Sequence, residues 1–324
     1  MKVMAGAATA GRMLKGLAGA ILGLALAGFV VVAVIRIAGQ FGVYDLTRDA
    51  SFADHSLPPP DPRSEAEMES LRTFPPGAVP LQALIDATPT GGTLRLEARL
   101  YAGPGLITRP LRLEGVPGTI IDGGGIGSII TVSAEDVAMS GVTLRNSGER
   151  HETTDSAVRL RARHGVYKDN VIENCLFGFD LRQADRNIIR RNRIGSKNFS
   201  EALRGDAVRV WYSNGNRIED NDIVHSRDAV VWYSKGNIIS GNRFRDSRYG
   251  IHLMYAHENT LERNDFIANT VGIFLMYAND NVIRDNVINY SQGPSGIGIG
   301  FKESSNTFVE NNDLFANARG VFMD

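Results

Sequence analysis

Two methionines and a histidine stand where their side chains could bind one metal ion. His252 and Met254 lie two residues apart in Gly250-Ile-His-Leu-Met-Tyr255, and Met276 occupies the matching position in Gly272-Ile-Phe-Leu-Met-Tyr277. Residues two apart in a strand share a face, and equivalent residues on stacked strands are about 4.8 Å apart. Thioether and imidazole donors suit a soft ion, chiefly Cu(I). We therefore predict a copper site at His252, Met254 and Met276; the alternative is that the methionines only fill gaps in packing.

Large apolar residues are expected beside these candidates. Aligning the repeated segments predicts two outward-facing columns, which are Arg209, Val230, His252, Phe274 and, next to it, Trp211, Trp232, Met254, Met276, Phe301. An exposed apolar strip of this size is typical of a partner or ligand site. A covering loop would instead make it ordinary core. We interpret Trp211, Trp232, Phe274 and Phe301 as a predicted partner-docking strip.

Asp206 and Asp228 form a further column that could perform acid–base chemistry or bind calcium. Polysaccharide-acting enzymes with stacked strands use paired carboxylates in this way. The next repeats carry Gly250 and Gly272 at this position, and an arginine lies close to each aspartate. Salt bridges or turn caps therefore explain the pair with fewer assumptions, and no catalytic residue is assigned.

The element that must position these residues is a repeat. The pattern Asn-x-hydrophobic-x-x-Asn recurs with a period near 22 residues, at Asn187/Asn192, Asn216/Asn221, Asn237/Asn242, Asn259/Asn264, Asn281/Asn286 and Asn306/Asn311, with Asn170 one step upstream. Short alternating runs of Val, Ile, Phe and Tyr between Gly, Asn, Asp and Ser indicate strands and turns. The sequence predicts an all-β fold, a right-handed parallel β-helix with coils of about 22 residues.

The asparagines have a structural reason to recur. Stacked amides at a corner can pair as a ladder, and Asn tolerates the left-handed backbone of sharp turns. A row of glycan-binding amides is the functional alternative. At the N-terminal end, the apolar spacing of Leu81-Gln-Ala-Leu-Ile-Asp-Ala87 predicts a short helix that caps the first coil. No cap is evident near Asp324, so we expect a partner protein there or a truncated product.

The chain is expected to have three parts. Residues 1–40 predict a transmembrane signal-anchor, because Lys2, Arg12 and Lys15 precede an uncharged apolar run from Gly16 to Ile35. Residues 41–78 read as a Pro-rich linker, and residues 79–324 as the β-helix domain. If the source is a Gram-negative bacterium, the domain lies in the periplasm, anchored to the inner membrane. A cleaved signal, leaving a soluble periplasmic protein, is the alternative.

Composition excludes several classes of protein. The 35 basic and 36 acidic residues give a net charge of −1, which argues against nucleic-acid binding. The single cysteine, Cys175, excludes an internal disulfide framework and a cysteine-based zinc site.

Three segments together resemble the NosD family of periplasmic copper-binding β-helix proteins. They are Arg248-Tyr-Gly-Ile-His-Leu-Met-Tyr255, Asn269-Thr-Val-Gly-Ile-Phe-Leu-Met-Tyr277 and Gly296-Ile-Gly-Ile-Gly-Phe-Lys302. Val210-Trp-Tyr-Ser213, Val231-Trp-Tyr-Ser234 and Ile121-Asp-Gly-Gly-Gly125 also fit, and the similarity runs from about Pro80 to Asp324.

The resemblance implies a non-enzymatic maturation factor. Such a protein assists copper-site assembly of nitrous oxide reductase, working with the ATPase and permease subunits of an ABC-type transporter and receiving copper from a chaperone. The resemblance also favours His252, Met254 and Met276 as copper ligands. A carbohydrate-active β-helix enzyme (lyase, hydrolase or epimerase) remains the alternative, and a scaffold that docks a protein without metal is a third.

Overall fold

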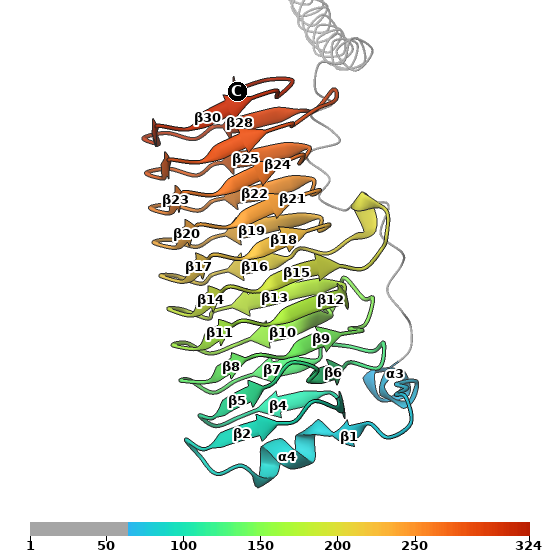
Figure 1. Cartoon of the computed structure of the whole chain (residues 1–324). Coiled ribbons are helices and arrows are strands. Elements are labelled where there is room, and N and C mark those ends of the chain that lie inside the picture. Colours follow the sequence, from blue (N-terminus) through green and yellow to red (C-terminus); the bar gives the residue numbers. More distant parts are fainter. Residues whose placement is uncertain (1–63) are drawn as a thin grey trace, which may run out of the picture. The chain divides into compact units, whose positions relative to one another are not determined.

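A computed structural model describes residues 64–324, and these residues form the predicted parallel β-helix. The chain winds through three parallel sheets, here called A, B and C, so that each coil adds one strand to each sheet (Figure 1). Sheet A has 11 strands, and sheets B and C have 10 each. Consecutive coils stack from the N-terminal end to the C-terminal end of the solenoid, which makes distant chain segments direct neighbours.

The strands are short, as a repeat of this length requires. Sheet A consists of β1 (Val79–Pro80), β3 (Leu100–Ala102), β6 (Ile120–Asp122), β9 (Thr143–Arg145), β12 (Val171–Cys175), β15 (Arg193–Ser196), β18 (Asp222–Val224), β21 (Arg243–Arg245), β24 (Asp265–Ile267), β27 (Val287–Asn289) and β30 (Asp313–Phe315). Sheet B consists of β2 (Thr93–Leu96), β5 (Arg112–Gly115), β8 (Ala138–Ser140), β11 (Val166–Lys168), β14 (Ile188–Arg190), β17 (Arg217–Glu219), β20 (Ile238–Ser240), β23 (Thr260–Glu262), β26 (Val282–Arg284) and β29 (Phe308–Glu310). Sheet C consists of β4 (Gly105–Ile107), β7 (Ile130–Val132), β10 (Ser156–Leu160), β13 (Phe177–Arg182), β16 (Val208–Trp211), β19 (Asp228–Trp232), β22 (Tyr249–Met254), β25 (Val271–Met276), β28 (Ile297–Lys302) and β31 (Val321–Met323).

Helix α4 (Leu81–Ala87) covers the first coil, as predicted. Its apolar residues Leu81 and Ile85 are completely buried, and both approach Gly105 at the start of β4. Burial of this apolar face keeps water from the open end of the core, which is the usual role of a terminal cap in a solenoid. A short 3-10 helix, η1 (Glu201–Leu203), interrupts the longer loop before β16.

The inside of the solenoid is a continuous apolar core. The predicted inward columns are confirmed, because Val208 pairs with Ala229 and Val210 with Val231, and the columns continue through Ile251/Ile273 and Leu253/Leu275. Phe244 and Phe266 stack at 4.8 Å between ring centroids, about the spacing of adjacent strands. Side chains of successive coils therefore bury one another, and each coil depends on its neighbours for a core.

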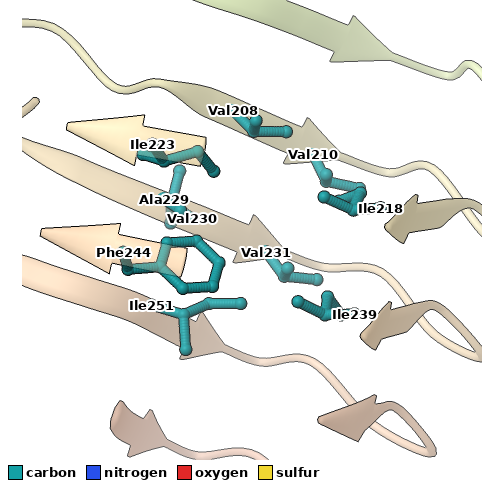
Figure 2. Close-up of a pocket in the computed structure, with 10 residues that line it drawn as sticks. All are labelled: Val208, Val210, Ile218, Ile223, Ala229, Val230, Val231, Ile239, Phe244 and Ile251. Atoms are coloured by element: carbon teal, nitrogen blue, oxygen red, sulfur yellow. The ribbon is translucent and has the colours of Figure 1, made fainter. Parts of the chain in front are cut away.

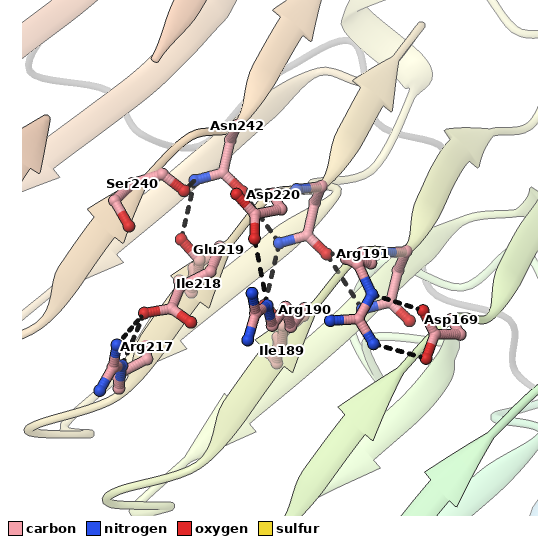
Figure 3. A network of polar contacts seen from close by, with 12 residues as sticks. Asp169, Ile189, Arg190, Arg191, Arg217, Ile218, Glu219, Asp220, Ser240 and Asn242 are labelled. Atoms are coloured by element: carbon pink, nitrogen blue, oxygen red, sulfur yellow. Dashed lines mark hydrogen bonds and ion pairs between the residues drawn. The ribbon is translucent and has the colours of Figure 1, made fainter. Parts of the chain in front are cut away.

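The asparagines form two buried amide ladders. Asn242, for example, receives hydrogen bonds from the backbone N–H and side chain of Asn221 and donates to Asn264 at 3.0 Å. It also donates to the carbonyl of Ile218, and Figure 3 shows its contact with the carbonyl of Ser240. Asn170 lies in the same ladder, as predicted, because it donates to Asn192. These amides satisfy backbone groups at corners where the chain leaves the sheet.

The predicted last pair of the repeat, Asn306/Asn311, is wrong in register. Asn286 donates to Asn312, not to Asn311, so Asn312 continues the ladder. Asn306 and Asn311 instead adopt the left-handed backbone conformation, each with φ 52°. In the dipeptide Asn311-Asn312, the first residue takes the left-handed corner and the second joins the ladder. The spacing in the sequence predicted Asn311 for the ladder position.

The outer edge of the coils beside the ladders carries ion pairs. Arg191 Nε lies 2.7 Å from Asp169, and Arg190 Nε lies 3.1 Å from Asp220 one coil further on (Figure 3). All four side chains are exposed, so these pairs contribute little to stability in water. These exposed side chains of alternating charge form a solvated edge of the stack.

The part of the chain before β1 is described from residue 64 onward. Helix α3 (Glu65–Ser70) begins with a capping box between Ser64 and Glu67. After it, the Thr73 N–H donates to the carbonyl of Gly124 at 3.3 Å, and Arg72 donates to the carbonyl of Gly123. Residues 64–78, assigned to the linker from the sequence, thus contact the β6–β7 loop. Residues 64–324 contain no helix that is long and apolar enough to cross a membrane. The predicted anchor at 1–40 and linker residues 41–63 lie outside the described residues.

Candidate metal and docking site on sheet C

Sheet C brings the predicted metal ligands together on its outer face. Met254 in β22 and Met276 in β25 are register partners, and His252 lies beside Phe274. Val230 and Trp232 precede them in the same two columns. His252 and Met254 are two residues apart in one strand, so both side chains leave the sheet on the same side. The side chains predicted to be vertical neighbours are therefore neighbours in the fold.

One member of the predicted strip, Phe301, is not on this face. In β28, Phe301 pairs with Leu275, whereas Lys302 pairs with Met276. Phe301 therefore points into the main core, where it is 8% exposed. The coil from Met276 to its register partner Lys302 is longer than the coil from Met254 to Met276, and the sequence alignment placed its end one residue too early. A shift of one residue moves a side chain to the opposite face of a strand.

The outer face is more shielded at its C-terminal part than the sequence suggested. His252, Met254 and Phe274 are 6%, 4% and 5% exposed, whereas Trp211 and Trp232 are half-buried. Phe274 forms a small apolar cluster with Val271 and Ile297, and Met276 packs against it. This cluster is separate from the solenoid core. It borders two of the candidate ligands, because Met276 packs against it and the His252 ring meets Phe274.

One ring nitrogen of His252 is buried without a hydrogen-bond partner in the described part of the chain. Its imidazole stacks on Tyr249 at 4.8 Å and meets Phe274 edge-on at 5.6 Å. Its Nε2 atom is buried and has no hydrogen-bond partner within residues 64–324. A buried nitrogen without a partner is costly, and it is suited to a ligand that can occupy that direction.

Burial lowers the pKa of His252 to about 4, and the positive charge of Arg248 adds to this, while Asp228 opposes it. The imidazole is therefore neutral near pH 7, with a lone pair available for a metal ion. Within residues 64–324, no three His, Cys, Asp or Glu side chains gather closely enough to hold a metal ion.

The carboxylates of Asp206 and Asp228 form ion pairs with arginines. Arg227 lies 3.2 Å from Asp206, and Arg248 binds Asp228 through its Nε at 3.1 Å and through Nη2. Both aspartates are 4% exposed. Burial raises the pKa of Asp206. Burial alone would also raise the pKa of Asp228, but Arg248 reverses this and lowers it. The salt-bridge interpretation of this pair is confirmed.

A tyrosine ladder beside the tryptophans was not recognised from the sequence. Tyr212, Tyr233, Tyr255 and Tyr277 stack in parallel at 5.0, 5.1 and 4.9 Å between successive rings. All four adopt positive φ values of 46–51°, which is uncommon for bulky residues. The signal was a tyrosine after every Trp or Met of the strip. Tyr233 also stacks on Trp232 at 5.7 Å, so ladder and strip form one aromatic surface.

The void inside the solenoid at these coils is not a ligand site. It is lined only by apolar side chains from all three sheets, among them Phe244 of sheet A, Ile239 of sheet B, and Val208 and Ala229 of sheet C (Figure 2). Ala229 is smaller than its register neighbours Val208 and Ile251, which leaves the space. A binding site needs polar groups to orient a ligand, and none is available here.

Comparison with known proteins supports the family resemblance over part of the chain. Residues 194–324 match the family model described as "Periplasmic copper-binding protein (NosD)". A protein of Pseudomonas aeruginosa named "Probable ABC transporter binding protein NosD" is 29% identical over 165 residues, which are 50% of this chain and 37% of that protein. A protein of the same name from Stutzerimonas stutzeri is 31% identical over 138 residues, 42% of this chain and 32% of that one. The matches thus span about a third of the length of these curated relatives.

Several solved structures share the fold. An alginate lyase from Paenibacillus has a TM-score of 0.57 at 11% identity, covering 75% of this chain and 94% of its own. The DFA-IIIase of Arthrobacter chlorophenolicus has a TM-score of 0.55 at 14% identity, covering 80% and 86%. At such low identity the likeness concerns only the β-helix. The resemblance to the NosD family is confirmed for residues 194–324, the part of the chain that carries His252, Met254 and Met276.

Proposed function

We propose that this protein is a periplasmic copper-binding accessory protein, and not an enzyme, which holds Cu(I) at His252, Met254 and Met276. The observation that carries the proposal is the register pairing of Met254 with Met276 beside the unpartnered, buried Nε2 of His252. Two thioethers and one imidazole form a soft donor set, and the neutral imidazole needs no deprotonation near pH 7.

The surroundings fit an ion that is passed on rather than kept. Met276 packs against the apolar cluster of Phe274, Val271 and Ile297, and the His252 ring meets Phe274, so apolar side chains shield this side of the site from water. Met276 is less buried than Met254, so one side of the site is within reach of a partner. In this role the copper ion is cargo.

The curated relatives are named as ABC transporter binding proteins, and the resemblance to NosD implies the client. We propose that the protein works with an ABC-type transporter, receives copper from a chaperone and assists assembly of the copper sites of nitrous oxide reductase. The predicted signal-anchor at 1–40 would hold the domain at the inner membrane, with a soluble periplasmic form as the alternative. The half-buried Trp211 and Trp232 would then belong to a partner-docking strip that also includes Phe274.

The test is a Cu(I) titration of the full chain under reducing conditions, in competition with a chromophoric chelator. Met254→Leu and Met276→Leu remove sulfur and nearly preserve volume, so packing changes little. We expect each to weaken Cu(I) binding by at least tenfold, roughly 1.4 kcal/mol. Met323→Leu is the control, because Met323 is exposed and lies outside the strip. Unchanged affinity in both strip variants would reject the ligand assignment.

The carbohydrate-active alternative rests on the buried pair Asp206 and Asp228. It predicts turnover of uronate polymers that disappears in Asp206→Asn. The ion pairs with Arg227 and Arg248 favour a structural role for these carboxylates. Activity that depends on Asp206, together with unaltered Cu(I) affinity in the methionine variants, would establish the enzyme instead.

A further inference from the structure

Four arginines gather on the outer face of sheet C, on the coils before the candidate copper site. Arg159 in β10 and Arg209 in β16 belong to one column, with Asp180 between them. Arg182 in β13 is the register partner of Trp211. Arg161 directly follows β10 and lies in the same column as Arg182, because Leu160 pairs with Leu181.

Two of these guanidinium groups, those of Arg182 and Arg209, have no carboxylate partner within residues 64–324. Asp180 is the one carboxylate in the two columns at these coils, and its Oδ2 accepts a hydrogen bond from Arg161 Nη2 at 2.7 Å. Arg209 Nη1 donates to the Thr154 hydroxyl at 3.1 Å, which is an uncharged acceptor. Arg182 and Arg209 thus leave a local surplus of positive charge that an anion would neutralise.

The guanidinium group of Arg182 lies over the ring of Trp211. Its Cζ lies 3.9 Å from the centroid of the Trp211 ring, a cation–π contact. Within residues 64–324, its guanidinium makes no hydrogen bond or ion pair, and the residue is exposed. Partial desolvation lowers the pKa of Arg182, and the charges of Arg161 and Arg209 lower it further. A planar fork fixed on an aromatic ring, with its donors unused, matches the two oxygens of a carboxylate.

The same outward column changes from basic to apolar along the solenoid. After Arg161 and Arg182 it continues with Trp211, Trp232, Met254 and Met276. Arg, Trp and Met are the residue types enriched in the centres of protein–protein interfaces. The indole N–H groups of Trp211 and Trp232 are buried and have no acceptor within the described residues. A polypeptide, which offers carbonyl acceptors and mixed side chains, complements this column better than a uniformly charged polymer.

We propose that Arg182, Arg209 and Trp211 form a docking site for an acidic segment of a partner protein. Carboxylates of the segment bind the Arg182 and Arg209 guanidinium groups, and apolar side chains that follow lie on Trp211 and Trp232. The site directs the partner along the column toward Met254 and Met276. Docking goes beyond copper binding and needs no metal, so it is tested on the metal-free protein and can fail without affecting the proposed copper site.

The two tryptophans of the chain provide the measurement. In the Trp232→Phe background, Trp211 is the sole tryptophan and its emission reports on the site. We expect a six-residue glutamate peptide, titrated at low salt, to change this emission saturably, whereas a six-residue glutamine peptide does not. Arg182→Gln should weaken peptide binding about tenfold or more, the value of a charge-assisted hydrogen bond. Arg182→Lys should also weaken it, because an ammonium group cannot form the bidentate contact.

Arg193→Gln is the matched control, because Arg193 is exposed on sheet A and its removal changes the net charge equally. Affinity within twofold of the parent is expected. Equal weakening by Arg193→Gln would mean that the peptide follows net charge, and absence of any change in Trp211 emission would mean that the site does not bind. Tighter binding of a uronate oligomer with the same number of carboxylates would assign the site to a polysaccharide. Each of these three results would overturn the proposal.

Discussion

Met254 and Met276 are direct register partners on adjacent coils, although a full turn of the solenoid separates them in the chain. Their sulfur atoms belong to two strands whose spacing is fixed by the backbone hydrogen bonds of sheet C, at about 4.8 Å. The relationship is therefore imposed by the stack and not by local sequence. The two thioethers therefore share the same neighbours. The column of His252 and Phe274 lies beside the column of Met254 and Met276 on the outer face of sheet C.

The buried histidine predicts a pH dependence of stability. The pKa of His252 is about 4 in the folded protein against 6.5 for the free side chain, so the unfolded state takes up a proton first as pH falls. Above pH 6.5 the neutral His252 costs the folded state nothing relative to the unfolded state. As pH falls from 6.5 to 4, the free energy of unfolding decreases by up to about 3 kcal/mol. The free energy of unfolding, measured with urea at pH 7 and pH 4.5, should therefore decrease less in His252→Phe than in the parent protein.

His164 serves as the control for this experiment, because it is exposed and adopts a left-handed backbone that Asn tolerates. His164→Asn should keep the pH dependence of the parent protein. If the parent and His252→Phe lose stability equally between the two pH values, the histidine is not held neutral by its burial.

The ion pair between Asp228 and Arg248 should be important for folding. Asp228 also accepts the backbone N–H of Tyr249 at 3.2 Å, so its removal takes away an acceptor for this N–H and leaves the Arg248 guanidinium without its carboxylate. Arg248 is partly exposed, and we expect Asp228→Ala to cost about 2–3 kcal/mol, below the range for a fully buried pair. Asp265→Ala breaks the exposed pair with Arg243 and should cost at most about 1 kcal/mol. Chemical denaturation of both variants compares them, and equal losses would show that burial does not decide the value of the pair.

The amide ladder predicts a strong dependence on single asparagines. Asn242 connects Asn221, Asn264 and two backbone carbonyls inside the corner. Asn242→Ala leaves several buried polar groups unsatisfied, and we expect a loss of about 2–4 kcal/mol in the free energy of unfolding. Asn198 is exposed and outside the ladder, and Asn198→Ala should change stability by less than about 0.5 kcal/mol. A small loss in Asn242→Ala would mean that water can replace the ladder.

The tyrosine ladder should stabilise its corner despite the unfavourable backbone. Tyr233 stacks on both Tyr212 and Tyr255, at 5.0 and 5.1 Å. Tyr233→Ala removes these two contacts and the stacking on Trp232, and should cost about 1–2 kcal/mol. Tyr233→Gly should recover about 1 kcal/mol of this, because glycine adopts φ 48° without strain.

Tyr290→Ala is the comparison for the ladder, since Tyr290 is exposed with φ 58° but only meets Phe315 edge-on. Its loss should be smaller than that of Tyr233→Ala in the same thermal or urea unfolding assay. Equal losses would indicate that stacking along the ladder adds nothing.

The fold was accessible to sequence reasoning because its rules are local and repeat. Alternation placed Val208 and Val210 inside and Arg209 outside, and the spacing of Leu81 and Ile85 predicted α4 with its observed bounds. Where the coil length changed, the same reasoning failed. Phe301 was assigned to the outer strip because Gly-rich residues before it gave no sign of the one-residue shift that turns it inward.

The sequence alone determined that the coils stack and that Met254 and Met276 share a face, because a two-residue alternation and a period near 22 are properties of the chain itself. Only the tertiary structure decided how deeply His252 is covered by Tyr249 and Phe274, and that the Arg182 guanidinium lies over the Trp211 ring. Burial and ring contacts depend on the side-chain positions of neighbouring coils and on the loops between them. A repeat fixes which residues are neighbours, whereas packing in three dimensions fixes their distance, their partners and their charge.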